Sequence, residues 1–132
     1  MADIEVRLIL QGGEADGGVH GYEPDSTVGG TVQLVTGQDV RCERVLVSIG
    51  WHTEGRGDRD AATVDEVELC RGPLSMNTSS THGFELTLPD QPWSYAGHYI
   101  NIIWEVTVTV AIPFARDVKR TEPIVVVPRR QH

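Results

Sequence analysis

Alternating apolar and polar residues run along most of this chain, and the longest such stretch lies towards its C-terminal end. Between His98 and Ile112 every even position from 100 onward is apolar, whereas most odd positions carry small or polar side chains such as Glu105 and Thr107. Successive side chains of a β-strand point to opposite faces, so this pattern predicts one dry face and one largely wet face. We expect this stretch to be the central strand of an antiparallel sheet that is packed on one side only.

Shorter stretches with the same alternation recur along the chain and are separated by turn residues. Gly29 and Gly30 indicate a bulge or a close backbone approach, and a change of parity near Glu66 indicates a bulge. No stretch shows a useful helical period, so the sequence predicts an all-β sandwich or barrel with a single domain over residues 1–132. We expect seven to eight strands, with the clearest at 4–10, 27–35, 40–51, 62–70, 83–88, 98–112 and 121–127.

Composition and charge narrow the classes of partner. The chain has 132 residues and a net charge of −8, which disfavours nucleic acid and a polybasic membrane anchor. No apolar run is long enough for a transmembrane helix and no signal peptide is visible, so we expect a cytoplasmic protein. The two cysteines, Cys42 and Cys70, are predicted to be free thiols because the cytosol is reducing; the alternative is a disulfide between neighbouring strands. They are too isolated for a zinc site.

Three segments in a fixed order carry a resemblance to a known family. The segments are YEPDSTVGGTV at 22–32, FELTLP at 84–89 and WSYAGHYINI at 93–102. In this order they resemble the arrestin-like family, which includes arrestin domains, the Vps26 retromer subunit and bacterial Spo0M-like proteins. The sequence departs from the family pattern at Asp25 and Ser26, where relatives have Gly-Glu. Trp104 stands where many members have tyrosine or another aromatic residue.

This resemblance implies both a fold and a function. The fold would be an immunoglobulin-like antiparallel β-sandwich of the arrestin type. The function would be that of a non-enzymatic adaptor or scaffold, which binds a protein partner through loops and an exposed sheet edge. Arrestins pair two such sandwiches and this chain is long enough for one, so the resemblance also implies self-association as a twofold homodimer.

Two segments are candidates for partner binding. The first is a charged, glycine-broken loop at 53–60, whose candidates are Arg56, Asp58, Arg59 and Asp60; the alternative is a solvated hairpin whose charges pair with one another. The second holds clustered aromatic and polar residues that are typical of interfaces, although they could instead cap the core. Its candidates are Trp93, Tyr95 and His98.

The sequence shows no clear catalytic or cofactor motif. It has no nucleophile elbow, phosphate loop or dinucleotide fingerprint, so we predict no enzymatic activity and no cofactor. His52 lies near Glu54, Asp58 and Asp60 in the sequence, but the spacing is not that of a metal site, and we predict no metal. The alternative function is a small-ligand or lipid-binding sandwich with a pocket between the sheets near the tryptophans Trp51, Trp93 and Trp104.

Overall fold

The protein is built from β-strands. The computed structural model describes residues 4–11, 14–16, 19–36, 40–56, 59–74, 79–97, 100–112 and 116–128. The described residues include no helix that is long and apolar enough to cross a membrane. They form ten strands: β1 (Ile4–Gln11), β2 (Glu14–Asp16), β3 (Val19–Tyr22), β4 (Thr27–Thr36), β5 (Val40–Gly55), β6 (Ala61–Leu74), β7 (Ser79–Thr87), β8 (Tyr95–Ala96), β9 (Ile100–Ala111) and β10 (Val118–Val126).

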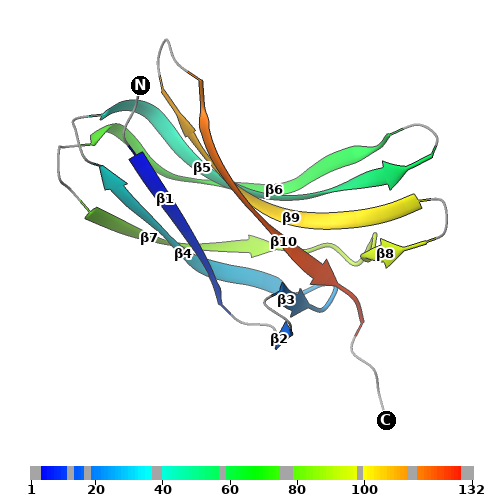
Figure 1. Ribbon diagram of the computed structural model, residues 1–132. Coiled ribbons are helices and arrows are strands. Elements are labelled where there is room, and N and C mark those ends of the chain that lie inside the picture. The colour runs from blue at the N-terminus through cyan, green and yellow to red at the C-terminus, as the bar shows by residue number, and fades with distance from the viewer. Residues whose placement is uncertain are drawn as a thin grey trace.

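The strands form two sheets that lie one over the other (Figure 1). The smaller sheet has the order β1-β4-β7, and the larger has the order β2-β3-β10-β9-β5-β6, with β8 paired to β9. Among the pairings of the described strands, only that of β3 with β10 is parallel. This architecture confirms the predicted antiparallel β-sandwich.

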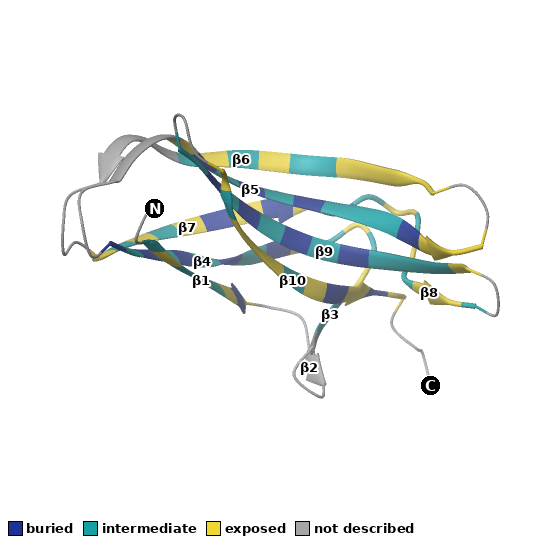
Figure 2. Cartoon of the chain, turned by 45° about the horizontal axis from the view of Figure 1, so that its top comes forward, coloured by how far each residue is buried: buried dark blue, intermediate teal, exposed yellow. Residues whose placement is uncertain are grey.

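β9 is a central strand of the larger sheet, as its alternation predicts. It lies between β10 and β5, and its even positions from Trp104 to Val110 are fully buried beneath the smaller sheet. Its odd positions are half-buried on the outer face, which gives the banded pattern of Figure 2. The dry face is shorter than predicted: Ile100 is 37% exposed, because the strands of the smaller sheet stop short of this end (Figure 1).

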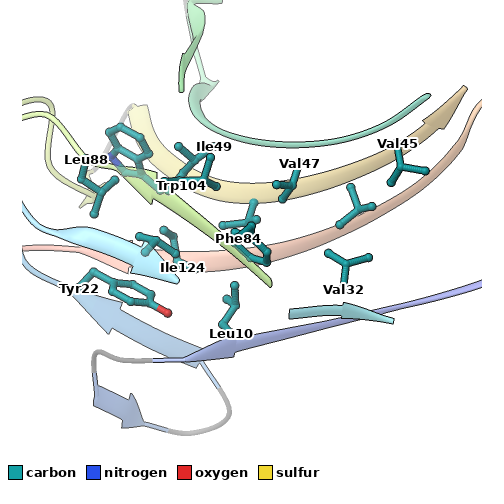
Figure 3. Close-up of a cluster of buried hydrophobic side chains, with 14 of the residues drawn as sticks. Leu10, Tyr22, Val32, Val45, Val47, Ile49, Phe84, Leu88, Trp104 and Ile124 are labelled. Atoms are coloured by element: carbon teal, nitrogen blue, oxygen red, sulfur yellow. The ribbon is translucent and has the colours of Figure 1, made fainter. Parts of the chain in front are cut away.

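The core fills the space between the two sheets. Its members come from β4 and β7 on one side and from β5, β9 and β10 on the other, and Figure 3 shows Val32, Phe84, Val47 and Trp104 among them. The indole N–H of Trp104 donates to the carbonyl oxygen of Pro92 at 3.0 Å, so the buried polar group of this side chain is satisfied.

Gly30 lies at a close approach between neighbouring strands, and the regular pairing of β4 shows no bulge there. A Cβ atom at Gly30 would meet the carbonyl oxygen of Ile9 and lie 2.9 Å from Cζ of Phe84. A Cβ atom at Gly83, across the β4–β7 pair, would find its nearest neighbour at 4.0 Å. The first glycine is therefore required by packing, whereas the second is not.

A tight turn joins β3 to β4 in the first segment of the arrestin-like resemblance. Pro24 and Asp25 form the turn, Asp25 has φ 60°, and the hydroxyl of Ser26 donates to the carbonyl oxygen of Glu23 at 2.6 Å. A positive φ at the third turn position favours glycine, which is the residue that the family pattern has there. Asp25 thus occupies a backbone conformation that suits glycine better.

Several features differ from the prediction. β2, β3 and β8 have two to four residues each and were not expected, and β7 begins at Ser79, inside a stretch that was expected to be a connection. One bulge was predicted near Glu66. The β5–β6 register shifts on both sides of this residue, between Thr63 and Asp65 and between Glu68 and Cys70. Pro123 lies within β10 and faces Glu105 of β9. Cys42 and Cys70 lie on the adjacent strands β5 and β6, and their side chains lie outside the described residues.

Candidate functional site

The two segments that the sequence marked for partner binding meet at one end of the sandwich. The first residues of β9 lie between the end of β5 and the short strand β8: Ile100 pairs with Gly55 on one side, and Asn101 pairs with Ala96 on the other. The charged loop follows directly after Gly55, and the aromatic segment contains β8. In Figure 1 both lie at the right-hand end of the larger sheet.

The aromatic segment is fixed to the sheet by its central serine. The backbone N–H of Ser94 donates to the carbonyl oxygen of Val126 at 2.7 Å, and the N–H of Val126 donates back to Oγ of Ser94 at 2.8 Å. The indole N–H of Trp93 donates to the carbonyl oxygen of Asp90 at 2.8 Å. These bonds hold the backbone of residues 90–96 in place at the end of β10.

Although the backbone is fixed, the large side chains on either side of Ser94 stay exposed. Trp93 is 48% exposed and Tyr95 is 56% exposed, so neither caps the core. Val125 and Val127 flank the bonded residue Val126 in the same way and are also exposed. Five exposed apolar side chains thus lie at this end of the larger sheet, some on its inner face and some on its outer face: Trp93, Tyr95, Ile100, Val125 and Val127.

The charged loop connects β5 to β6 beside this apolar group. The backbone N–H of Thr53 donates to the carbonyl oxygen of Asp60 at 2.9 Å, and the N–H of Asp60 donates to Oγ1 of Thr53 at 2.8 Å. Arg56, Arg59 and Asp60 are exposed. We call these three residues and the five apolar residues together the end surface; the other two predicted candidates, Asp58 and His98, lie outside the described residues.

His52 lies on the outer face of the larger sheet, next to the charged loop. Its Nε2 is 3.2 Å from Glu54, as its neighbourhood in the sequence suggested, but its Nδ1 is 3.2 Å from Glu105 of β9, which the sequence did not indicate. The two carboxylates lie at opposite nitrogens of the ring and so cannot share one ion with it. Among the residues that the structure describes, no group of three or more His, Cys, Asp and Glu could hold a metal ion.

Two shallow hollows adjoin His52. One of about 250 Å³ lies on the outer face and is floored by Gly50 and Ala62. The other, of about 460 Å³, lies where the charged loop leaves β5 and joins β6, and is lined in part by Arg59 and Asp60.

The three tryptophans differ in burial. Trp104 is fully enclosed in the core, Trp51 is half-buried and pairs with it across β5 and β9, and Trp93 is 48% exposed at the end of the molecule. Of the three, Trp51 alone lines a hollow beside His52, and the alternative of an apolar ligand site stays a prediction.

Tyr22, the first residue of the segment at 22–32, is a buried ionisable group. Its side chain is 4% exposed, and its hydroxyl donates to the carbonyl oxygen of Gln11 at 3.0 Å. Burial raises the pKa of the Tyr22 hydroxyl above its ordinary value of 10.0, because the charged form loses hydration. The hydroxyl is thus a neutral donor that joins β3 to the end of β1.

Comparison of the sequence with family models and with curated proteins gives no match. Comparison of the structure does: Spo0M, a sporulation control protein from Bacillus subtilis, matches with a TM-score of 0.76 over 98% of this chain, at 17% sequence identity. The chain has the fold of Spo0M.

The Spo0M comparison confirms the arrestin-like resemblance at the level of fold. The chain spans 51% of the Spo0M chain, so the likeness concerns about half of that protein. An identity of 17% carries architecture and not site residues. The function must therefore be argued from the end surface itself.

Proposed function

We propose that this chain is a non-enzymatic protein-interaction module of the cytoplasm, a single sandwich domain over residues 1–132 that acts as an adaptor or scaffold. It binds a protein partner through the end surface. The observation that carries this proposal is the meeting of two candidate segments, one aromatic and one charged, at the first residues of β9.

The composition of the end surface is that of a protein interface. Binding energy at interfaces is concentrated in large aromatic and apolar anchors, and a polar, charged rim surrounds them. Trp93 and Tyr95 supply such anchors, and Arg56, Arg59 and Asp60 supply such a rim.

The rigidity of the aromatic segment supports the same proposal. Ordering a mobile loop on binding costs free energy, whereas a surface that is already fixed avoids this cost. The reciprocal bonds between Ser94 and Val126, and the bond from Trp93 to Asp90, fix the segment in advance. The role of Spo0M in sporulation control is consistent with a regulatory binding module.

A comparative pull-down tests the proposal. The chain, the variant Trp93→Ala/Tyr95→Ala and the control Glu85→Ala are immobilised and exposed to the same native lysate, and the retained proteins are quantified. Glu85 is exposed on β7, so the control removes an exposed side chain elsewhere. We expect a specific partner to be retained by the chain and the control and lost from the double variant, by about tenfold or more. Equal retention by all three would show that the end surface is not the contact.

A further inference from the structure

The free edges of the two sheets differ in how well they are protected against pairing with another strand. An unpaired edge is a template for a further strand, and proteins blunt such edges with bulges, prolines, lysines or covering groups. β6 has register shifts along its length, β2 has only three residues, and the open part of β10 carries Lys119, Arg120 and Pro123. β7 is tied to β6 at its end, where the N–H of Thr87 donates to the carboxylate of Asp65 at 2.8 Å.

β1 has none of these devices in its described residues. It is an edge strand of the smaller sheet, eight residues long, and it pairs with β4 without a register shift. At its last residue the hydroxyl of Tyr22 donates to the carbonyl oxygen of Gln11. Part of β1 also lies close to β10 without pairing with it. The first half of β1 is therefore a regular strand edge that forms a ladder with no described strand other than β4.

The side chains on the first half of β1 are self-complementary. Glu5 and Arg7 point to solvent from the same face and form an ion pair of 3.1 Å within the strand, at 59% and 56% side-chain exposure. In an antiparallel pair of two identical strands centred on Val6, Glu5 of each copy lies opposite Arg7 of the other. Centring on Arg7 would instead place like charges opposite each other, and like charges opposed in this way are destabilising.

We propose that two copies of this chain associate through β1, as a twofold antiparallel pair centred on Val6 that joins the two smaller sheets into one. The proposal deepens the proposed interaction function by naming a second copy as one partner, and it uses an edge separate from the end surface. Such an isologous contact closes on itself, as a twofold dimer must.

The side chains on the inner face of β1 also favour an antiparallel pair of β1 strands centred on Val6. Ile4, Val6 and Leu8 face the core, yet each is only half-buried, because β1 has a neighbour on one side alone (Figure 2). With Val6 at the centre, Ile4 lies opposite Leu8 of the second copy, and Val6 lies opposite its own counterpart. The pairing thus extends the apolar inner face while it matches the charges on the outer face.

Charge reversal tests the proposal without removing any packing. Glu5→Arg or Arg7→Glu alone places like charges opposite each other twice, whereas a mixture of the two variants restores both complementary contacts in a heterodimer. The matched control is Arg120→Glu, which disrupts the exposed Arg120–Glu122 ion pair of 3.5 Å, also spaced by two residues, on the part of β10 that β3 does not pair with. A contact between two strand edges buries little surface, so we expect weak association. Sedimentation equilibrium must therefore reach a protein concentration of roughly one millimolar.

The proposal predicts a concentration-dependent dimer for the chain and for Arg120→Glu. It predicts that each single β1 variant dissociates about fiftyfold more readily and that their mixture associates as the unaltered chain does. A chain that stays monomeric at every concentration, single variants that associate unchanged, or a mixture that fails to associate would each overturn it. Loss of the dimer leaves the pull-down result for the end surface intact, so the two proposals fail separately.

Discussion

Replacing Ser94 by alanine should weaken both the fold and the end surface. The substitution removes the oxygen that accepts the N–H of Val126, a residue whose side chain is fully buried, while the backbone bond from Ser94 to Val126 remains. A buried backbone donor left without a partner costs about 1–2 kcal/mol. For a domain of this size, that loss lowers the midpoint of thermal unfolding by roughly 4–8 °C.

The assay is a pair of urea and thermal unfolding curves, with amide hydrogen exchange at Val126 and with Ser26→Ala as the control. Ser26 also loses one short side-chain bond, but its partner is the exposed turn carbonyl of Glu23, so we expect a loss of at most about 0.5 kcal/mol. Ser94→Ala should also speed exchange at Val126 and reduce retention of the partner. If both variants lose the same stability and exchange at Val126 is unchanged, Ser94 does not fix the aromatic segment.

Three further predictions concern the scaffold. Gly30→Ala should destabilise the protein by about 1–3 kcal/mol, because the added Cβ meets the backbone and an aromatic ring. Gly83→Ala should be neutral or stabilise the protein by up to about 1 kcal/mol, because its Cβ would find its nearest neighbour at 4.0 Å. Thermal unfolding compares the stability of the two variants. As the pH rises above 10, the unfolded chain loses the Tyr22 proton before the folded chain does, so the free energy of unfolding should fall. At pH ~8 the chain should be about 1 kcal/mol more stable than Tyr22→Phe. Urea unfolding should show that this difference shrinks as the pH rises. Asp25→Gly should stabilise the turn by about 0.5 kcal/mol, measured in the same way, because glycine adopts the positive φ without strain.

Each of these predictions has a result that would contradict it. Equal stability of Gly30→Ala and Gly83→Ala would mean that the strands do not approach closely at Gly30. A decline above pH 10 that is as steep in Tyr22→Phe as in the unaltered chain would assign the pH dependence to other groups. A destabilised Asp25→Gly would show that the aspartate side chain makes a contact that outweighs the backbone strain.

The alternation of apolar and polar residues predicted the long strands because burial of one face leaves a period of two in the sequence. β9 shows this well, from Trp104 to Val110. The same signal fails for β2, β3 and β8, since two to four residues hold too few alternations to stand out. Pro123 lies within the strand that was predicted at 121–127, and the ladder tolerates this proline because β10 is open on its other side at that point.

The candidate site was predictable in its parts but not in its assembly. Both segments carried a local signal, one of charge and glycine and the other of clustered aromatics. Their meeting depends on the register that pairs Gly55 with Ile100, and a register follows from tertiary pairing rather than from local pattern. For the same reason Glu105 could be assigned to the wet face of β9, but its contact with His52 could not be anticipated.

Site-specific photo-crosslinking in cells shows whether the end surface contacts a protein partner. A photoreactive phenylalanine analogue replaces Tyr95 in one sample and Glu85, an exposed residue of β7, in the control. The account predicts a discrete adduct with another protein on irradiation of the sample labelled at position 95, and none from position 85. Absence of any adduct at position 95 beyond that of the control would contradict it.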